Sequence, residues 1–145
     1  MKFIFFLMIF CMSLCAFAAE DPWNSTQVLQ PQQFVEILKN PKNGPVILHV
    51  GFQFLYKNNH IPGSKYVGPA NEESGLNHLK TELEKIPRDR EVVIYCGCCP
   101  LTKCPNMRPA FKAVQAMGFK NIKILNLPEN LKKDWIEKNY PVEKG

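Results

Sequence analysis

The stretch Val92-Val93-Ile94-Tyr95-Cys96-Gly97 joins a run of β-branched and aromatic residues to a cysteine and a glycine. A short apolar run of this kind predicts a buried strand, over 91–95, and the glycine after it favours a loop. In open α/β sheets, ligands bind outside the carboxyl ends of the strands. We therefore expect the Cys96 thiol to lie at that edge of the sheet, and sulfur chemistry is the first functional hypothesis.

The loop that follows this strand is rich in cysteine. Cys96, Cys98, Cys99 and Cys104 fall within nine residues, out of six cysteines in the whole chain. Three interpretations of Cys98, Cys99 and Cys104 stay open: a resolving or reversible redox partner for Cys96, a soft thiolate site for Cu(I) or Zn formed by these three cysteines with or without Cys96, or structural disulfides. In the last case Cys98 and Cys99 would pair outward, because a bond between neighbours is strained.

The start of the chain has the pattern of a secretory signal peptide over residues 1–18. Lys2 is followed by an apolar stretch and by the small-residue cleavage pattern Ala16-Phe17-Ala18. The apolar stretch is shorter than the roughly 20 residues that a spanning helix needs, so a membrane anchor is the weaker alternative. We expect an exported protein, periplasmic or secreted, with no membrane span after cleavage. Residues 19–145 then fit one domain, in a compartment that permits disulfides.

The charge pattern limits the class of partner. Lys and Arg number 18 against 13 Asp and Glu, for a formal net charge of +5. The basic residues are spread along the chain and do not interleave with aromatic residues in a stripe, so we expect no nucleic-acid partner. The sequence has no oligomerisation signature, and a monomer is expected.

Apolar periodicity predicts alternating helices and strands. The pattern favours helices over 32–39, around the stripe Leu76, Leu79, Leu83 and Ile86, over 106–117 and over 131–138, and strands over 46–50, 65–67, 91–95 and 122–127. Alternation of this kind implies right-handed crossovers and a mainly parallel sheet with helices on both faces. The predicted fold class is α/β.

Three segments resemble the rhodanese-like superfamily. The segment 60–64, His-Ile-Pro-Gly-Ser, is similar to the family's His-Ile-Pro-Gly-Ala signature. Segment 92–96 matches its strand and active cysteine, and segment 118–125 matches its Gly-Phe-x-Asn-Val segment and following strand. The resemblance spans most of residues 19–145 and implies a rhodanese-like fold. It also implies that His60, Pro62 and Gly63 form a structural turn.

The activity that this resemblance implies is sulfurtransferase activity without a cofactor. In the family, a cysteine thiolate takes a sulfane sulfur from thiosulfate or a persulfide and passes it to a thiol acceptor or a redox partner protein. Cys96 occupies the catalytic position, and the loop N–H groups, including that of Gly97, together with Arg108, would hold an anionic donor. The alternatives are a buried or disulfide-bonded Cys96 and a solvated Arg108.

Two departures from the family pattern leave other functions open. Typical members read Asp-Val-Arg where this chain has His49-Val50-Gly51, which removes both charges and leaves His49 expected as a packed, hydrogen-bonded core histidine. The loop after Cys96 is several residues longer than usual. No cysteine is followed six positions later by arginine, which argues against phosphatase chemistry. A soft-metal thiolate protein and a non-catalytic binding module with structural disulfides remain the alternatives.

Overall fold

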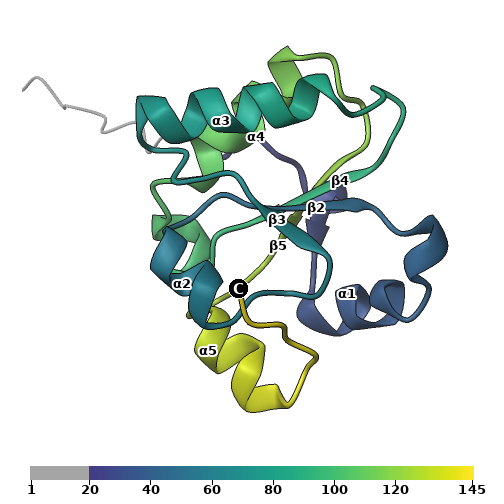
Figure 1. Ribbon diagram of the computed structural model, residues 1–145, viewed down its shortest axis with the longest axis vertical. Coiled ribbons are helices and arrows are strands. Elements are labelled where there is room, and N and C mark those ends of the chain that lie inside the picture. The colour runs from purple at the N-terminus through teal and green to yellow at the C-terminus, as the bar shows by residue number, and fades with distance from the viewer. Residues whose placement is uncertain (1–19) are drawn as a thin grey trace, which may run out of the picture.

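Five short strands form one parallel sheet in the computed structural model, which describes residues 20–145 (Figure 1). The strand order is β1-β5-β4-β2-β3, and every neighbouring pair is parallel. This confirms the predicted α/β class. The strands are β1 (Val28–Leu29), β2 (Val46–His49), β3 (Ser64–Tyr66), β4 (Val92–Tyr95) and β5 (Ile122–Leu125).

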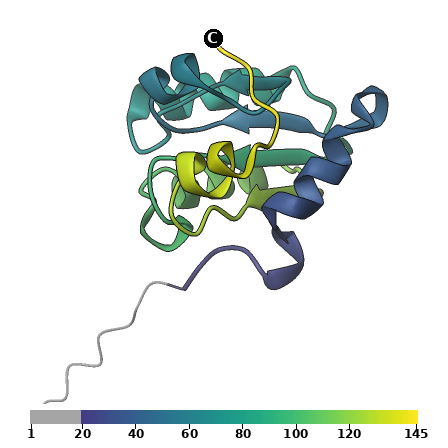
Figure 2. The same ribbon diagram turned by 90° about the horizontal axis from the view of Figure 1, so that it is seen from below.

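Helices cover both faces of this sheet (Figures 1 and 2). They are α1 (Pro31–Leu38), α2 (Gln53–Asn58), α3 (Glu73–Glu84), α4 (Met107–Ala116) and α5 (Leu131–Asp134). Short 3-10 turns lie at Ser25–Gln27, Pro41–Asn43, Leu101–Lys103 and Ile136–Lys138. Because parallel strands need crossover connections, helices between them necessarily fall on the faces of the sheet.

The side chains of β4, the central strand, alternate between two cores. Val92 and Ile94 point into a cluster that includes Leu79 and Leu83 of α3 and Phe111 of α4. Each such fully buried aliphatic or aromatic side chain contributes about 1.5–3 kcal/mol by leaving water.

The opposite face of β4 is equally apolar. Val93 and Tyr95 point into a second cluster with Phe34 of α1, Leu131 of α5 and Trp135. A strand buried on both faces explains why 92–95 is an unbroken apolar run rather than an alternating one.

Three segments differ from the sequence-based expectation. The helix predicted over 131–138 is interrupted at Trp135, whose backbone leaves the helical region (φ −129°, ψ −61°). The indole is fully buried and its Nε1–H donates to the carbonyl oxygen of Pro141 at 2.8 Å, so tertiary packing overrides the local helix. Strand β1 and helix α2 were not predicted from the sequence.

The predicted signal peptide over residues 1–18 lies outside the described residues. Across residues 20–145, no helix combines the length and the apolar character that crossing a membrane requires.

Candidate functional site

Cys96 directly follows β4 and is buried, with 3% of its surface exposed. Its thiol lies against the backbone of Gly51, in the segment after β2: a Cβ at position 51 would come within 2.7 Å of the Cys96 Sγ and 2.9 Å of the Cys96 carbonyl oxygen. Only glycine leaves room for the sulfur there. The backbone of Gly51 thus forms a wall beside the thiol.

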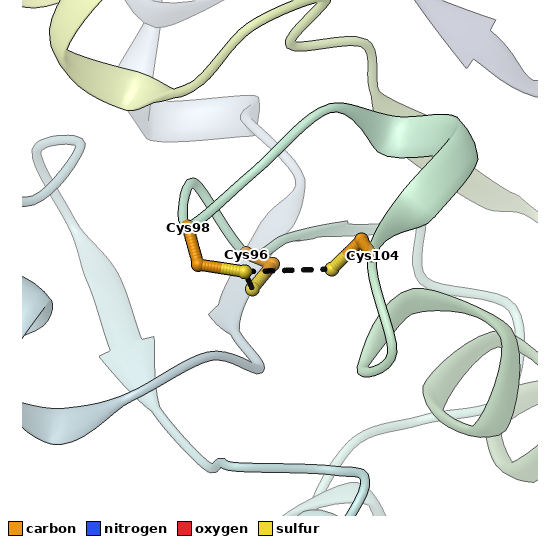
Figure 3. A group of neighbouring side chains, drawn as sticks. All are labelled: Cys96, Cys98 and Cys104. Atoms are coloured by element: carbon orange, nitrogen blue, oxygen red, sulfur yellow. Dashed lines mark hydrogen bonds between the residues drawn. The ribbon is translucent and has the colours of Figure 1, made fainter.

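Three of the loop cysteines bring their sulfurs together (Figure 3). The Sγ atoms of Cys96, Cys98 and Cys104 all lie within 4.8 Å of one another. The Cys96 thiol donates to the Cys98 Sγ at 3.2 Å, and the Sγ atoms of Cys98 and Cys104 are 3.9 Å apart. These separations exceed the roughly 2.05 Å of a disulfide bond, so the cluster consists of thiols.

Cys99 is placed differently from the other three. Its Sγ is 2.9 Å from that of Cys98, but it is not part of the set whose sulfurs are all mutually close. It is half-buried, like Cys98, whereas Cys96 and Cys104 are buried. The sequence alone did not distinguish Cys98, Cys99 and Cys104 from one another. In the structure, the sulfurs of Cys98 and Cys104 lie close to that of Cys96, whereas Cys99 lies outside this group.

Asn106 is a site residue that the sequence reasoning did not single out. It is fully buried, its Nδ2–H donates to the Cys96 Sγ at 3.4 Å, and its Oδ1 accepts from the backbone N–H of Asn71 at 3.0 Å. The signal was its position directly before α4, where a polar side chain ordinarily caps a helix. Here the side chain instead turns to the thiol.

Hydrogen bonding divides the negative charge unevenly within the cluster. Hydrogen bonding with Cys96 and Cys98, together with the backbone N–H groups of Asn106 and Met107, holds the pKa of Cys104 well below its ordinary value. The hydrogen bond with Cys104, reinforced by burial, raises the pKa of Cys96. The positive end of the α4 dipole lies beside Cys104, so we place the thiolate there rather than on Cys96.

Gly97 lies between Cys96 and Cys98 in the sequence, and Arg108, in helix α4, follows Cys104. The Arg108 guanidinium donates to the carboxylate of Asp21 and to the carbonyl oxygen of Thr102 at 3.2 Å, and lies over the ring of Trp23. Gly97 has a positive φ of 81°, and its carbonyl accepts from the N–H of Leu131. Their predicted roles in donor binding stay predictions.

His49 is packed as expected but is not hydrogen-bonded as expected. It is fully buried, with its ring near those of Tyr56, Tyr66 and Tyr95. Neither ring nitrogen has a hydrogen-bond partner among the residues described. Burial lowers the pKa of His49 to about 4, so its ring is neutral at physiological pH.

Space around the cluster is uneven. A void of about 10 Å³ touches Cys96, Cys99 and Cys104. On the outer side, an open groove of about 230 Å³ runs past Gly97 and Cys98 between residues of α2 and α5, including Leu55 and Leu131. Cys98 is therefore the member of the sulfur cluster that borders open space.

Comparison with known proteins identifies the fold family. The family model described as rhodanese-like domain matches residues 30–127, and the chain belongs to this family. Comparison with curated proteins finds no match.

Solved structures from several bacteria share the fold. A protein from Bacillus halodurans is 19% identical, with 80% of this chain and 75% of that chain covered and a TM-score of 0.63. The rhodanese-like domain of an Anabaena protein is 15% identical, covering 82% and 80%, with a TM-score of 0.60. Thiosulfate sulfurtransferase from Pseudomonas aeruginosa is 26% identical over 82% of this chain but 19% of its own length, with a TM-score of 0.59.

Proposed function

We propose that this protein is a sulfurtransferase that carries sulfane sulfur as a persulfide on Cys96, with Cys98 as the resolving thiol. One observation carries the proposal: Cys96 ends the central strand of a rhodanese-like sheet and its Sγ has a second thiol, that of Cys98, at 3.2 Å. Membership of the family and the likeness to a thiosulfate sulfurtransferase support the same class of reaction.

Loading of Cys96 is a displacement at sulfur. The Cys96 thiol first passes its proton to the Cys104 thiolate within the sulfur cluster. The Cys96 thiolate so formed attacks the outer sulfur of thiosulfate, a new S–S bond forms, the S–S bond of thiosulfate breaks, and sulfite leaves with the electron pair. With a persulfide donor, a thiolate leaves instead. The Asn106 amide, which donates to the Cys96 Sγ, would stabilise negative charge on that sulfur.

Cys98 can react with the persulfide on Cys96 in two ways. Attack of the Cys98 thiolate on the inner sulfur forms a Cys96–Cys98 disulfide and releases hydrogen sulfide, after which a dithiol reductant must restore both thiols. Attack on the outer sulfur moves the sulfane sulfur to Cys98, which borders the groove, where an external thiol can accept it. This second reaction, transfer of the outer sulfur, consumes no reductant.

Loading of Cys96 requires that the sulfur donor can reach its thiol. The void beside Cys96 is about 10 Å³, too small for a thiosulfate ion, and the groove is bordered by Cys98 but not by Cys96. Loading of Cys96 therefore requires a displacement of the loop that carries Cys98. The proposal also includes a thiosulfate or persulfide donor, export, and action as a monomer.

Mass spectrometry after treatment with thiosulfate tests the proposal. The reduced protein is incubated with thiosulfate, alkylated and digested, and the peptide carrying Cys96 should gain the mass of one sulfur atom. With cyanide as acceptor, the loaded protein should release thiocyanate. A Cys96→Ser variant should show neither signal.

The loop offers a matched control. Cys99→Ser removes a thiol from the same loop without removing a contact to Cys96, and it should load like the unmodified protein. Cys98→Ser should load but hold its persulfide longer. Sulfur gained by Cys96→Ser to the same extent would assign the reaction to another cysteine and refute this proposal.

A further inference from the structure

We propose that Cys96, Cys98 and Cys104 form a three-coordinate Cu(I) site, a binding function separate from the sulfur transfer proposed above. The three thiols come from the end of β4, from the loop, and from the segment just before α4, and their sulfurs converge on one point (Figure 3). A copper ion and a persulfide cannot occupy Cys96 together, so these are alternative states of the cluster.

The spacing of the sulfurs already approaches that of a trigonal metal site. A trigonal ion with metal–sulfur bonds of about 2.3 Å holds its three sulfurs about 4.0 Å apart. Here Cys98 and Cys104 are 3.9 Å apart, Cys96 and Cys98 are 3.2 Å apart, and all three sulfurs lie within 4.8 Å of one another. Small side-chain rotations are sufficient to reach the metal-bound geometry.

The lining of the site selects a soft ion. The void beside the cluster is bordered by thiols and by apolar side chains of Leu101, Met107, Leu125 and Leu127. Mg²⁺ and Ca²⁺ require oxygen ligands, whereas thiolates favour Cu(I) and Zn²⁺. The donor set thus restricts the choice to these two ions.

Space and ligand number then favour Cu(I) over Zn²⁺. Zinc is four-coordinate, and with three protein ligands it keeps a water in the fourth position. The void is about 10 Å³, which is at or below the roughly 10–15 Å³ that one water requires. The remaining loop thiol, Cys99, borders the same void and its Sγ is 2.9 Å from that of Cys98, but it lies outside the set of sulfurs that are all within 4.8 Å of one another. A three-coordinate ion without water fits this arrangement.

Groups around the three sulfurs complete the site. The Asn106 amide donates to the Cys96 Sγ and is itself fixed by the N–H of Asn71. Cys104 precedes the ten-residue helix α4, whose dipole places partial positive charge beside it. Donors of this kind orient thiolate ligands and offset the negative charge of a trithiolate complex.

A competition titration tests the site. The full chain carries Cys11→Ser and Cys15→Ser, so that the four loop cysteines are its only thiols. It is reduced, freed of oxygen and titrated with Cu(I) in the presence of the chromogenic chelator bathocuproine disulfonate. We expect one Cu(I) per chain, and X-ray absorption at the copper edge should give three sulfur neighbours. Cys104→Ser should weaken binding at least about 100-fold, because loss of outer-shell partners alone costs about 10–100-fold.

Cys99→Ser is the matched control and should bind Cu(I) as tightly as its parent. Cys98→Ser, at a half-buried position, repeats the test if circular dichroism shows that Cys104→Ser does not fold. An equal loss in Cys99→Ser, a count of two or four sulfurs, or a preference for Zn²⁺ in a parallel titration would overturn the proposal. Persulfide loading is measured without copper, so either function can fail alone.

Discussion

The turn over 60–64 and the loop over 96–106 both contact the end of β4, but different atoms hold them. In the turn, the Tyr95 hydroxyl accepts from the N–H of Ile61 at 3.1 Å and bonds the Ser64 hydroxyl at 3.0 Å, while the His60 Nδ1 lies 2.9 Å from the carbonyl oxygen of Tyr56. In the loop, the side-chain contacts of Cys96 are to the Cys98 sulfur and to the Asn106 amide, and Cys98 in turn contacts the sulfurs of Cys99 and Cys104. The first region has the fixed partners of a structural element, and the second has weak, exchangeable ones.

The two regions offer a matched pair of glycine substitutions, with the largest expected effects on stability. Gly63 in the turn (φ 73°) and Gly97 in the loop (φ 81°) both have backbone angles that favour glycine. A Cβ at Gly63 meets nothing within 4 Å, whereas one at Gly97 lies 2.8 Å from the Leu131 Cβ.

Urea unfolding should separate these two variants. We expect Gly63→Ala to lose about 1 kcal/mol, the cost of the left-handed backbone alone. Gly97→Ala should lose about 3 kcal/mol, because overpacking adds to that strain. Equal losses would mean that Leu131 moves aside easily, and that the loop is less tightly held against α5 than the structure indicates.

Removing the Tyr95 hydroxyl should destabilise the turn over 60–64 without changing the reactivity of the loop thiols. Tyr95→Phe leaves the buried N–H of Ile61 and the hydroxyl of Ser64 without this partner, which we expect to cost about 2 kcal/mol of unfolding free energy. Persulfide loading of Cys96 should change by less than about twofold, a difference below about 0.5 kcal/mol. A large loss of loading at full stability would show that the turn also controls the thiol.

The corresponding test in the loop changes Asn106, which should affect sulfur loading more than stability. Asn106→Asp keeps an oxygen that can accept from the N–H of Asn71 but replaces the donor to Cys96 with a negative charge. We expect thiosulfate loading to slow by about tenfold, which corresponds to loss of about 1.4 kcal/mol of stabilisation at the sulfur. Stopped-flow alkylation gives a second measure, and a rate equal to that of the parent would contradict a role for this amide.

A group of three charged side chains between β3 and α3, outside both regions, provides the smallest expected effect and a pH reference. Hydrogen bonds from Lys65 and Lys85 lower the pKa of Glu82 from 4.5 to about 2. The stabilisation is complete above pH 4.5 and is lost as the pH falls towards 2. Glu82→Gln should therefore cost less than about 1 kcal/mol at pH 7, because both ammonium groups are largely exposed.

Denaturation at several pH values measures the Glu82 effect. The difference between Glu82→Gln and its parent should shrink between pH 4.5 and pH 2. A difference that stays constant over this range would assign the effect to packing rather than to charge.

The local pattern of apolar residues was sufficient to predict most of the helices and strands. The apolar run over 92–95 and the stripe of α4 bury their side chains as their periods predict. By contrast, β1 has two residues and α2 buries none of its six. Neither element therefore has a repeating pattern of apolar residues from which it could be predicted. At Trp135 the local pattern favoured a continuous helix, and the burial of the indole prevented it.

The candidate site was less predictable because it depends on long-range contacts. The position of Cys96 followed from the strand that precedes it. Which of the added cysteines reach it depends on how the loop folds back, and the partnership of Asn106 with both Asn71 and Cys96 joins segments distant in sequence. Sequence did show that Gly51 lacks a charge, but not that its missing side chain makes room for a sulfur.

The close approach of Gly51 to Cys96 has a consequence for protein engineering. Transplanting residues 96–106 into a relative with arginine at the position of Gly51 would bring in a placement of Cys96 that leaves no room for a side chain there, because a Cβ at position 51 lies 2.7 Å from the Cys96 Sγ. The graft should become functional when the glycine is transferred as well. The loop and the glycine therefore fit each other as a pair and are best transferred together.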